Sequence, residues 1–213
     1  MVAAGALISG AGTNLQAIID RIAAGRLDCT LRIVVSNRPG APGLARAERA
    51  GIPTRVLDHR EFASRDDFDR TVVRVLREAG VELVLLAGFD RLLSSGFVDA
   101  FPQRIMNVHP ALLPSFKGLH AQRQALGYGV KIAGASVHFV DAQTDHGPII
   151  VQGAVPVAPD DTEETLRERI LAVEHEIYPI AIQLFAEGRL RVEGRRVLVR
   201  GPRGPGPRSI VSW

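Results

Sequence analysis

The first half of the chain alternates short apolar runs with amphipathic stretches, and this alternation constrains the fold more than any other feature. Apolar or β-branched runs at residues 4–8, 31–36 and 81–87 predict strands, and apolar residues between them recur at helical spacing. The last run is almost wholly apolar, as expected of a strand buried on both faces. The pattern predicts an α/β fold, with a mostly parallel central sheet and helices on both faces.

The second half of the chain is less regular. A strand is expected over residues 104–109, and two antiparallel strands are expected over residues 132–140 and 148–155. A long final helix is expected over residues 162–187, interrupted or ended near Pro179, whose ring disfavours a continuous helical ladder. We therefore expect antiparallel strands toward the C-terminal half of the sheet.

Composition indicates one soluble domain. With 213 residues, 46% of them apolar and 23% charged, the chain can bury a sizeable core. We expect a single domain over residues 1–200 and a mobile Gly/Pro/Arg tail over residues 201–213. No apolar run is long enough to predict a membrane span, and the single cysteine, Cys29, fits a cytoplasmic protein.

The basic charge of the protein is confined to its C-terminal end. From Arg189 onward there are seven arginines and one acid, a balance of +6. Because the formal total is +3, residues 1–188 carry −3. No aromatic residues are interleaved with these arginines to form a stacking surface, so we expect no nucleic-acid partner.

Residues 9–14 form a glycine-containing turn between the first strand and the first helix. Gly12 lets the backbone approach a ligand, and Thr13 and Asn14 lie where helix N–H groups favour an anion. Position 15 is leucine, so the dinucleotide-binding spacing is not met, and a single phosphate is the better prediction. The alternative is a plain turn in which Thr13 caps the helix.

An Asn-x-His pair ends the strand at residues 104–109. Side chains alternate along a strand, so Asn107 and His109 are expected on the same face, and Asp145 follows in a later turn. A donor amide, an imidazole and an acid that favours its charged form are the groups needed to act on a carbonyl. The alternative is a buried histidine satisfied by a loop carbonyl.

The other histidines give weaker indications. His138 lies in a predicted strand, where a core or surface role is expected, and His59 lies in a polar segment and is expected to be solvated. No spacing among the six histidines and Cys29 matches a metal site, so no metal is expected. Residues 86–93 follow a buried strand, at the sheet edge where open α/β sheets bind ligands.

Several segments together resemble the glycinamide ribonucleotide formyltransferases, folate-dependent enzymes of purine biosynthesis. The matching segments are residues 9–19, 35–38, 86–93, 107–114, 118–125, 136–140, 145–149 and 174–179. They occur in family order over about residues 4–190 and are jointly specific. The resemblance implies a Rossmann-like formyltransferase fold, with 10-formyltetrahydrofolate as the co-substrate.

The resemblance also implies roles for individual residues. The catalytic residues would be Asn107, His109 and Asp145. The residues that bind glycinamide ribonucleotide would be Gly12, Thr13, Asn14 and Glu174. The folate-binding residues would be Arg65, Asp90, Arg91, Leu92, Leu93 and Asn107. Asp90 departs from the family pattern, which usually has a hydrophobic residue at this position.

Related enzymes and a non-enzyme remain as alternatives. Methionyl-tRNA formyltransferase normally has an additional C-terminal domain, for which the residues after Arg189 are too few. Formyltetrahydrofolate hydrolase normally begins with a regulatory domain, which the residues before Ala4 cannot form. A non-catalytic phosphosugar- or folate-binding module is the third alternative, and a homodimer is left open.

Overall fold

The computed structural model describes residues 1–201, so the predicted mobile tail, apart from its first residue, lies outside the described residues. Contacts divide the chain into two compact units. Unit 1 consists of Met1–Asn107 and Phe139–Ala142, and unit 2 consists of Val108–His138 and the chain from Gln143 onward. The expectation of one domain over residues 1–200 stays a prediction.

Unit 1 is built on a parallel sheet, as predicted. Its strands occur in the order β3-β2-β1-β4-β5, and each neighbouring pair is parallel. The strands are β1 (Val2–Ile8), β2 (Cys29–Ser36), β3 (Thr54–Val56), β4 (Leu83–Leu86) and β5 (Ile105–His109), whose last two residues belong to unit 2.

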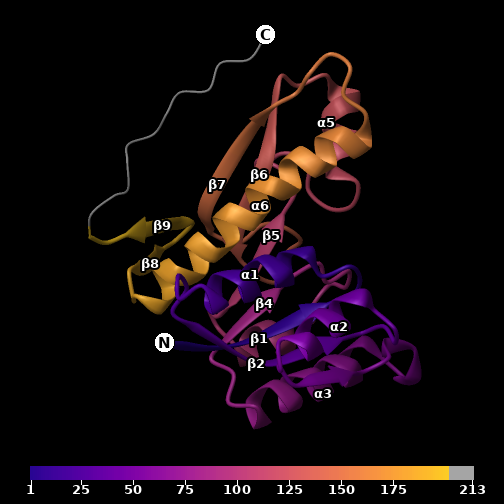
Figure 1. Ribbon diagram of the computed structural model, residues 1–213, viewed down its shortest axis with the longest axis vertical. Helices are drawn as coiled ribbons and strands as arrows, with labels where there is room; N and C mark the ends of the chain where they lie inside the picture. Colours follow the sequence, from indigo (N-terminus) through magenta and orange to yellow (C-terminus); the bar gives the residue numbers. More distant parts are fainter. Residues whose placement is uncertain (202–213) are drawn as a thin grey trace. The chain divides into compact units, whose positions relative to one another are not determined.

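Helices cover both faces of this sheet (Figure 1). They are α1 (Thr13–Ala23), α2 (Pro42–Arg49), the short 3-10 helix η1 (His59–Glu61), α3 (Arg65–Glu78) and α4 (Ser95–Ala100). Leu7 packs with Phe68 and Leu76 of α3, whereas the next residue, Ile8, faces Gly43 of α2. Alternate residues of one strand therefore fill two apolar layers, which explains the apolar run.

Helix α3 lies between the apolar runs at residues 31–36 and 81–87, where the sequence has apolar residues at helical spacing. Ser64 caps the helix by accepting the N–H of Asp67 at 3.1 Å, and its hydroxyl donates to the Asp67 carboxylate at 2.7 Å. Phe68, Val72 and Leu76 form its buried stripe. The helical spacing of apolar residues and the cap are both local signals, so the prediction did not depend on distant contacts.

Unit 2 contains the antiparallel strands expected in the C-terminal half. Strand β6 (Ile132–Phe139), whose last residue belongs to unit 1, pairs antiparallel with β7 (Ile149–Pro156). Strand β8 (Leu190–Glu193) pairs antiparallel with β9 (Arg196–Val199). The remaining elements are the helices α5 (Ala121–Tyr128) and α6 (Glu163–Ala186). Among residues 1–201, no helix is both long and apolar enough to cross a membrane.

Helix α6 runs through Pro179 without a break, so the expected interruption there is wrong. An internal proline costs about 3 kcal/mol, whereas each fully buried aliphatic side chain contributes roughly 1.5–3 kcal/mol. Helix α6 packs on β7, and Ile170 and Ile182 are buried. A Cβ at Gly153 of β7 would collide with Val173, which shows how closely the two elements approach. Packing therefore outweighs the lost hydrogen bond.

Candidate active site

The loop between β1 and α1 ends in a glycine with left-handed backbone geometry. Gly12 has φ 69° and occupies the N-cap position, where no side chain caps the helix. The alternative in which Thr13 caps the helix is wrong, because Thr13 is the first helical residue. The N–H groups of the first turn are therefore not capped by a side chain, which favours binding of an anion.

Helix α2 holds this loop in place. A Cβ at Gly12 would lie 2.7 Å from the Cα of Gly43, so the two backbones touch. The Gly43 N–H donates to the Gly10 carbonyl oxygen at 3.0 Å. Arg46 donates from Nε to the Ala11 carbonyl oxygen at 2.8 Å. This guanidinium adds positive charge beside the start of α1, which further favours an anion.

We expect Gly12→Ala to disturb both the fold and the loop. A left-handed backbone costs a non-glycine residue about 1–2 kcal/mol, and the contact with Gly43 adds about 1–3 kcal/mol. Gly51→Ala is a matched control, since Gly51 also has φ 69° but has open space at its Cβ. Urea unfolding should show a larger loss of stability for Gly12→Ala, and equal losses would contradict the close approach.

The loop between β4 and α4 contains the predicted folate-binding residues 90–93. The guanidinium carbon of Arg91 lies 5.5 Å from the centroid of the Phe68 ring, which fixes the side chain by a cation–π contact. The Nε of Arg91 is buried and has no hydrogen-bond partner within the part of the chain that the structure describes. Leu92 is 59% exposed. Arg91 as a whole is partly exposed, so a donor side chain and an apolar side chain are both accessible to a ligand.

A buried acid fixes the far end of this loop. The Ser94 N–H donates to the Asp69 carboxylate at 2.6 Å. Burial raises the pKa of Asp69, and the hydrogen bonds from Ser94 and the charges of Arg65 and Arg91 partly oppose this. Arg65 and Arg91, both predicted to bind folate, thus act on one carboxylate at the end of the loop.

The site residues of unit 1 gather at the carboxyl edge of its sheet. Strands β1, β4 and β5 are neighbours, and Leu86 of β4 is in register with Asn107 of β5. The Ser9 N–H donates to the Gly88 carbonyl oxygen at 2.9 Å, joining the loops that follow β1 and β4. These loops therefore lie at the sheet edge where residues 86–93 were expected, and the roles of their residues stay predictions.

The structure brings His109 and Asp145 into contact within unit 2. The His109 Nδ1 lies 3.3 Å from Asp145 Oδ2, and its Nε2 lies 2.9 Å from the Phe116 carbonyl oxygen. Both partners are acceptors, and a neutral imidazole has a single N–H to donate. The protonated ring therefore fits this environment best. The alternative interpretation expected a loop carbonyl as the partner of the histidine. The Phe116 carbonyl is such a partner, and it lies on the opposite side of the ring from Asp145.

Asp145 is held from two further directions. The Gly118 N–H donates to its Oδ2 at 2.9 Å, and the Nε2 of His138 lies 3.7 Å from its Oδ1. Asp145 itself has φ 45°, a conformation that non-glycine residues adopt at a cost. The surrounding contacts therefore maintain a strained backbone that directs this carboxylate between two imidazoles.

The sequence did not reveal this role of His138. The side chain is 2% exposed, and we expected a core or surface residue. A histidine near the end of a mostly apolar strand is costly to bury without a polar partner, and this was the available signal. The partner itself is separated from it by a loop, so alternation along the strand could not identify Asp145.

The turn after His109 is fixed by side chains of β6 and β7. Ser136 accepts the Leu113 N–H at 2.9 Å and donates to the Ala111 carbonyl oxygen at 2.7 Å. Gln152 donates to Ser136 Oγ at 2.8 Å and to the Leu113 carbonyl oxygen at 3.0 Å. This partly buried network immobilises residues 110–114 and, through them, the end of β5 that carries the imidazole.

Asp145 stays ionised to a lower pH than an ordinary aspartate. Burial by itself would raise the pKa of Asp145, but hydrogen bonds from His138 and Gly118 and the charges of His109 and His138 outweigh it. The pKa of Asp145 therefore lies below its usual value.

A pH-dependent contribution to stability follows. Because the folded pKa of Asp145 lies below the unfolded value of about 3.9, the ionised group stabilises the fold at higher pH. This contribution is lost as pH falls through the folded pKa. Asp145→Asn should therefore be less stable than the wild type at neutral pH, and the gap should shrink below about pH 4. Urea unfolding at both pH values measures the gap, and one that widens in acid would contradict the assignment.

Other predicted residues have different outcomes. Glu174 is 7% exposed in the middle of α6, and its role stays a prediction. His59 is only partly solvated: its side chain is 24% exposed, its Nδ1 lies 3.0 Å from the Asn37 carbonyl oxygen and its ring packs edge-on against Phe68. Among residues 1–201, no group of three or more histidine, cysteine or acidic side chains is arranged to hold a metal ion.

Comparisons with known proteins agree with the sequence resemblance. The profile of the formyl transferase family matches residues 4–182. Phosphoribosylglycinamide formyltransferase of Escherichia coli (strain K12) is 44% identical over 199 residues, 93% of this chain and 94% of that protein. The trifunctional purine biosynthetic protein adenosine-3 of Gallus gallus is 51% identical over 186 residues, 87% of this chain. The chain spans less than a fifth of such trifunctional relatives, 18% of the Gallus protein.

Solved structures extend the likeness to three dimensions. Glycinamide ribonucleotide transformylase 1 from Symbiobacterium toebii has a TM-score of 0.92 and 55% identity, over 93% of this chain and 94% of that chain. Phosphoribosylglycinamide formyltransferase from Coxiella burnetii has a TM-score of 0.89 and 44% identity, over 93% of each chain. These matches confirm the predicted α/β fold class and the predicted family. The chain therefore belongs to the formyl transferase family and, within it, to the phosphoribosylglycinamide formyltransferases.

Proposed function

We propose that this protein transfers the formyl group of 10-formyltetrahydrofolate to the amino group of glycinamide ribonucleotide. The products are formylglycinamide ribonucleotide and tetrahydrofolate, and the reaction belongs to purine biosynthesis in the cytoplasm. The observation that carries the proposal is the buried contact between His109 and Asp145 at the end of β5, two residues beyond Asn107. The family of the chain supports the same reaction.

The ribonucleotide phosphate is proposed to bind at the start of α1. Gly12, Thr13 and Asn14 would offer backbone N–H groups there, and Arg46 supports this by adding positive charge beside Ala11. Glu174 would contact the same substrate through its carboxylate. The electropositive helix start favours a phosphorylated acceptor over water.

The folate is proposed to bind at residues 90–93, Arg65 and Asn107. The partly exposed side chain of Arg91, a donor group, supports a polar contact with the folate. The exposed side chain of Leu92 supports an apolar contact. A flat heteroaromatic ring with hydrogen-bonding edges meets both requirements.

In the proposed reaction, the substrate amine attacks the formyl carbon and the formyl oxygen becomes an oxyanion. Asn107, through its side-chain amide, and protonated His109 donate hydrogen bonds to that oxygen, and Asp145 favours the charged imidazole. Collapse of the intermediate breaks the bond between the formyl carbon and N10 of the folate. N10 of the folate gains a proton and the substrate amine loses one, so the transfer neither releases nor consumes a proton overall.

His109 must change one hydrogen bond to act in this way. Its Nδ1 faces Asp145, and its Nε2 faces the Phe116 carbonyl oxygen at 2.9 Å. The formyl oxygen would therefore replace the Phe116 carbonyl as the acceptor at Nε2. The left-handed backbone of Phe116, with φ 52°, makes this loop conformation costly and favours the exchange.

The proposal is tested by following the absorbance change when 10-formyltetrahydrofolate loses its formyl group, with and without glycinamide ribonucleotide. Turnover that requires the ribonucleotide supports the transferase. Turnover without it would instead indicate a hydrolase. If neither mixture reacts although folate binds, the non-catalytic binding module becomes the better account.

A further inference from the structure

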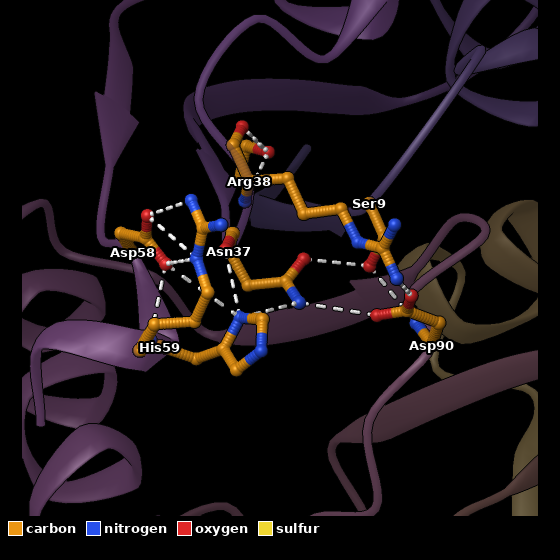
Figure 2. A network of polar contacts seen from close by, with 8 residues as sticks. Ser9, Asn37, Arg38, Asp58, His59 and Asp90 are labelled. Carbon is orange, nitrogen blue, oxygen red and sulfur yellow. Dashed lines mark hydrogen bonds and ion pairs between the residues drawn. The ribbon is translucent and has the colours of Figure 1, made fainter. Parts of the chain in front are cut away.

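A network of polar side chains joins three loops of unit 1 (Figure 2). Ser9 follows β1, Asn37 and Arg38 follow β2, and Asp90 lies in the loop after β4. The Ser9 hydroxyl donates to Asn37 Oδ1 at 2.6 Å, and the Asp90 N–H donates to Ser9 Oγ at 2.9 Å. Asn37 Nδ2 donates to Asp90 Oδ1 at 3.1 Å, and Arg38 pairs with Asp90 Oδ2. Both carboxylate oxygens of Asp90 are thus engaged within the protein.

Asn37 is the buried centre of this network. Asn37 is fully buried, and Ser9 is 8% exposed. The Nδ1 of His59 lies 3.0 Å from the Asn37 carbonyl oxygen and 3.4 Å from Asn37 Nδ2. When His59 Nδ1 carries a proton and donates to the carbonyl, it cannot also accept from Nδ2. Asp90 is then the acceptor for the buried amide, and removing it would leave a donor unpaired.

The ion pair with Arg38 contributes less than the amide contact. The side chains of Arg38 and Asp90 are 57% and 36% exposed, so solvent screens their charges. The network therefore depends on Asp90 as a hydrogen-bond acceptor for Asn37, and Arg38 is a secondary partner. Substitution of Asp90 should therefore disturb the loop more than substitution of Arg38.

The network fixes one end of the loop that follows β4. At the other end, the Ser94 N–H donates to the Asp69 carboxylate at 2.6 Å. Between these anchors the side chain of Leu92 is 59% exposed, and Arg91 is held over Phe68. The backbone of residues 90–93 is therefore set by two acids, one at each end, neither of which needs to touch a ligand.

We propose that Asp90 is a positioning residue that, through Asn37 and Ser9, holds residues 90–93 in the conformation that receives the folate. The inference rests on the proposed function, because it takes this loop to be the folate site. It assigns Asp90 a different role from a direct folate ligand. A hydrophobic residue at this position could not accept a hydrogen bond from the Asn37 amide, so in this chain hydrogen bonds to Asp90 hold the loop.

The test compares Asp90→Leu, Asp90→Asn and Arg38→Met with the wild type. Asp90→Leu should raise KM for 10-formyltetrahydrofolate by about ten- to a hundredfold, because the loop loses its anchor. KM for glycinamide ribonucleotide and kcat should stay within about twofold. Asp90→Asn keeps an acceptor oxygen and should recover most of the loss. Arg38→Met should behave nearly as the wild type.

Two further measurements make the result decisive. Calorimetric titration with tetrahydrofolate measures binding without turnover. If the wild type transfers no formyl group, the proposed function is refuted, but the titration still tests the positioning role of Asp90. Thermal melting identifies a variant that does not fold. If Asp90→Leu does not fold, Ser9→Ala decides, since it removes both hydrogen bonds of the Ser9 hydroxyl and should weaken tetrahydrofolate binding.

Three outcomes would overturn the inference. The first is wild-type folate affinity in Asp90→Leu or, if that variant does not fold, in Ser9→Ala. The second is an equal change in kcat and both KM values, which indicates a general structural defect. The third is an Arg38→Met variant as impaired as Asp90→Leu, which would assign the effect to the exposed ion pair.

Discussion

Replacing His109 by alanine should lower kcat by a factor of about 10²–10³ and leave KM for glycinamide ribonucleotide within about twofold. The loss is large because the ring is buried and its N–H groups are fixed by Asp145 and Phe116 before any substrate arrives. A fixed donor in a dry site stabilises an oxyanion far more than one in water. KM is expected to change little because the proposed phosphate site at Gly12–Asn14 does not use the imidazole.

His109→Gln is the matched control for this prediction. A glutamine amide can place a neutral N–H near the position of Nε2 but cannot carry the positive charge. We expect its kcat to exceed that of His109→Ala by about tenfold and to remain far below the wild type. Steady-state kinetics with both substrates measure these values. Near-normal turnover in His109→Ala would refute the proposed mechanism.

Asp145→Asn should lower kcat by about a hundredfold, although the two side chains have nearly the same shape. The carboxylate accepts from the Gly118 N–H and faces the Nδ1 of His109 and the Nε2 of His138. An amide in its place can turn its NH₂ group toward an imidazole N–H, and it no longer favours the imidazolium. The proposed donor would then lose the carboxylate partner that faces its Nδ1.

The matched control is Asp160→Asn, which makes the same change of charge at an exposed acid of unit 2. It should leave kcat within about twofold of the wild type. His138→Gln should give an intermediate loss, because it removes one of the groups around Asp145 and keeps a neutral donor. A wild-type kcat in Asp145→Asn would show that the ion pair with His109 does not support the reaction.

Local signals were enough to predict most of the fold. The strands β1, β2 and β4 and the helix α3 follow from apolar spacing and from the Ser64 cap, which act within a few residues of the chain. The Asn107 and His109 pair was also predicted from local pattern, because the alternation of a strand relates side chains two residues apart. A parallel sheet then brings the loops after its strands to one edge.

Contacts between distant parts of the chain had to come from the tertiary structure. Ser9 and Asp90 meet across 81 positions, and Asn37 meets Asp90 across 53, distances over which no sequence periodicity operates. His138 and its partner Asp145 are only seven positions apart, but the loop between them is irregular, so no periodicity relates the two side chains either. Pro179 shows the reverse case, in which a strong local signal predicted a helix end and packing on β7 overrode it.

The sequence by itself thus determined the order of helices and strands, the family and the residues that carry the proposed chemistry. Spacing and motifs are properties of residues that are close in the sequence, so they can be recognised without knowledge of the fold. The tertiary structure decided which acceptors surround the His109 ring, which groups hold Asp145 and which acid anchors the loop at residues 90–93. These contacts depend on packing, because burial determines which of many possible polar partners each side chain must use.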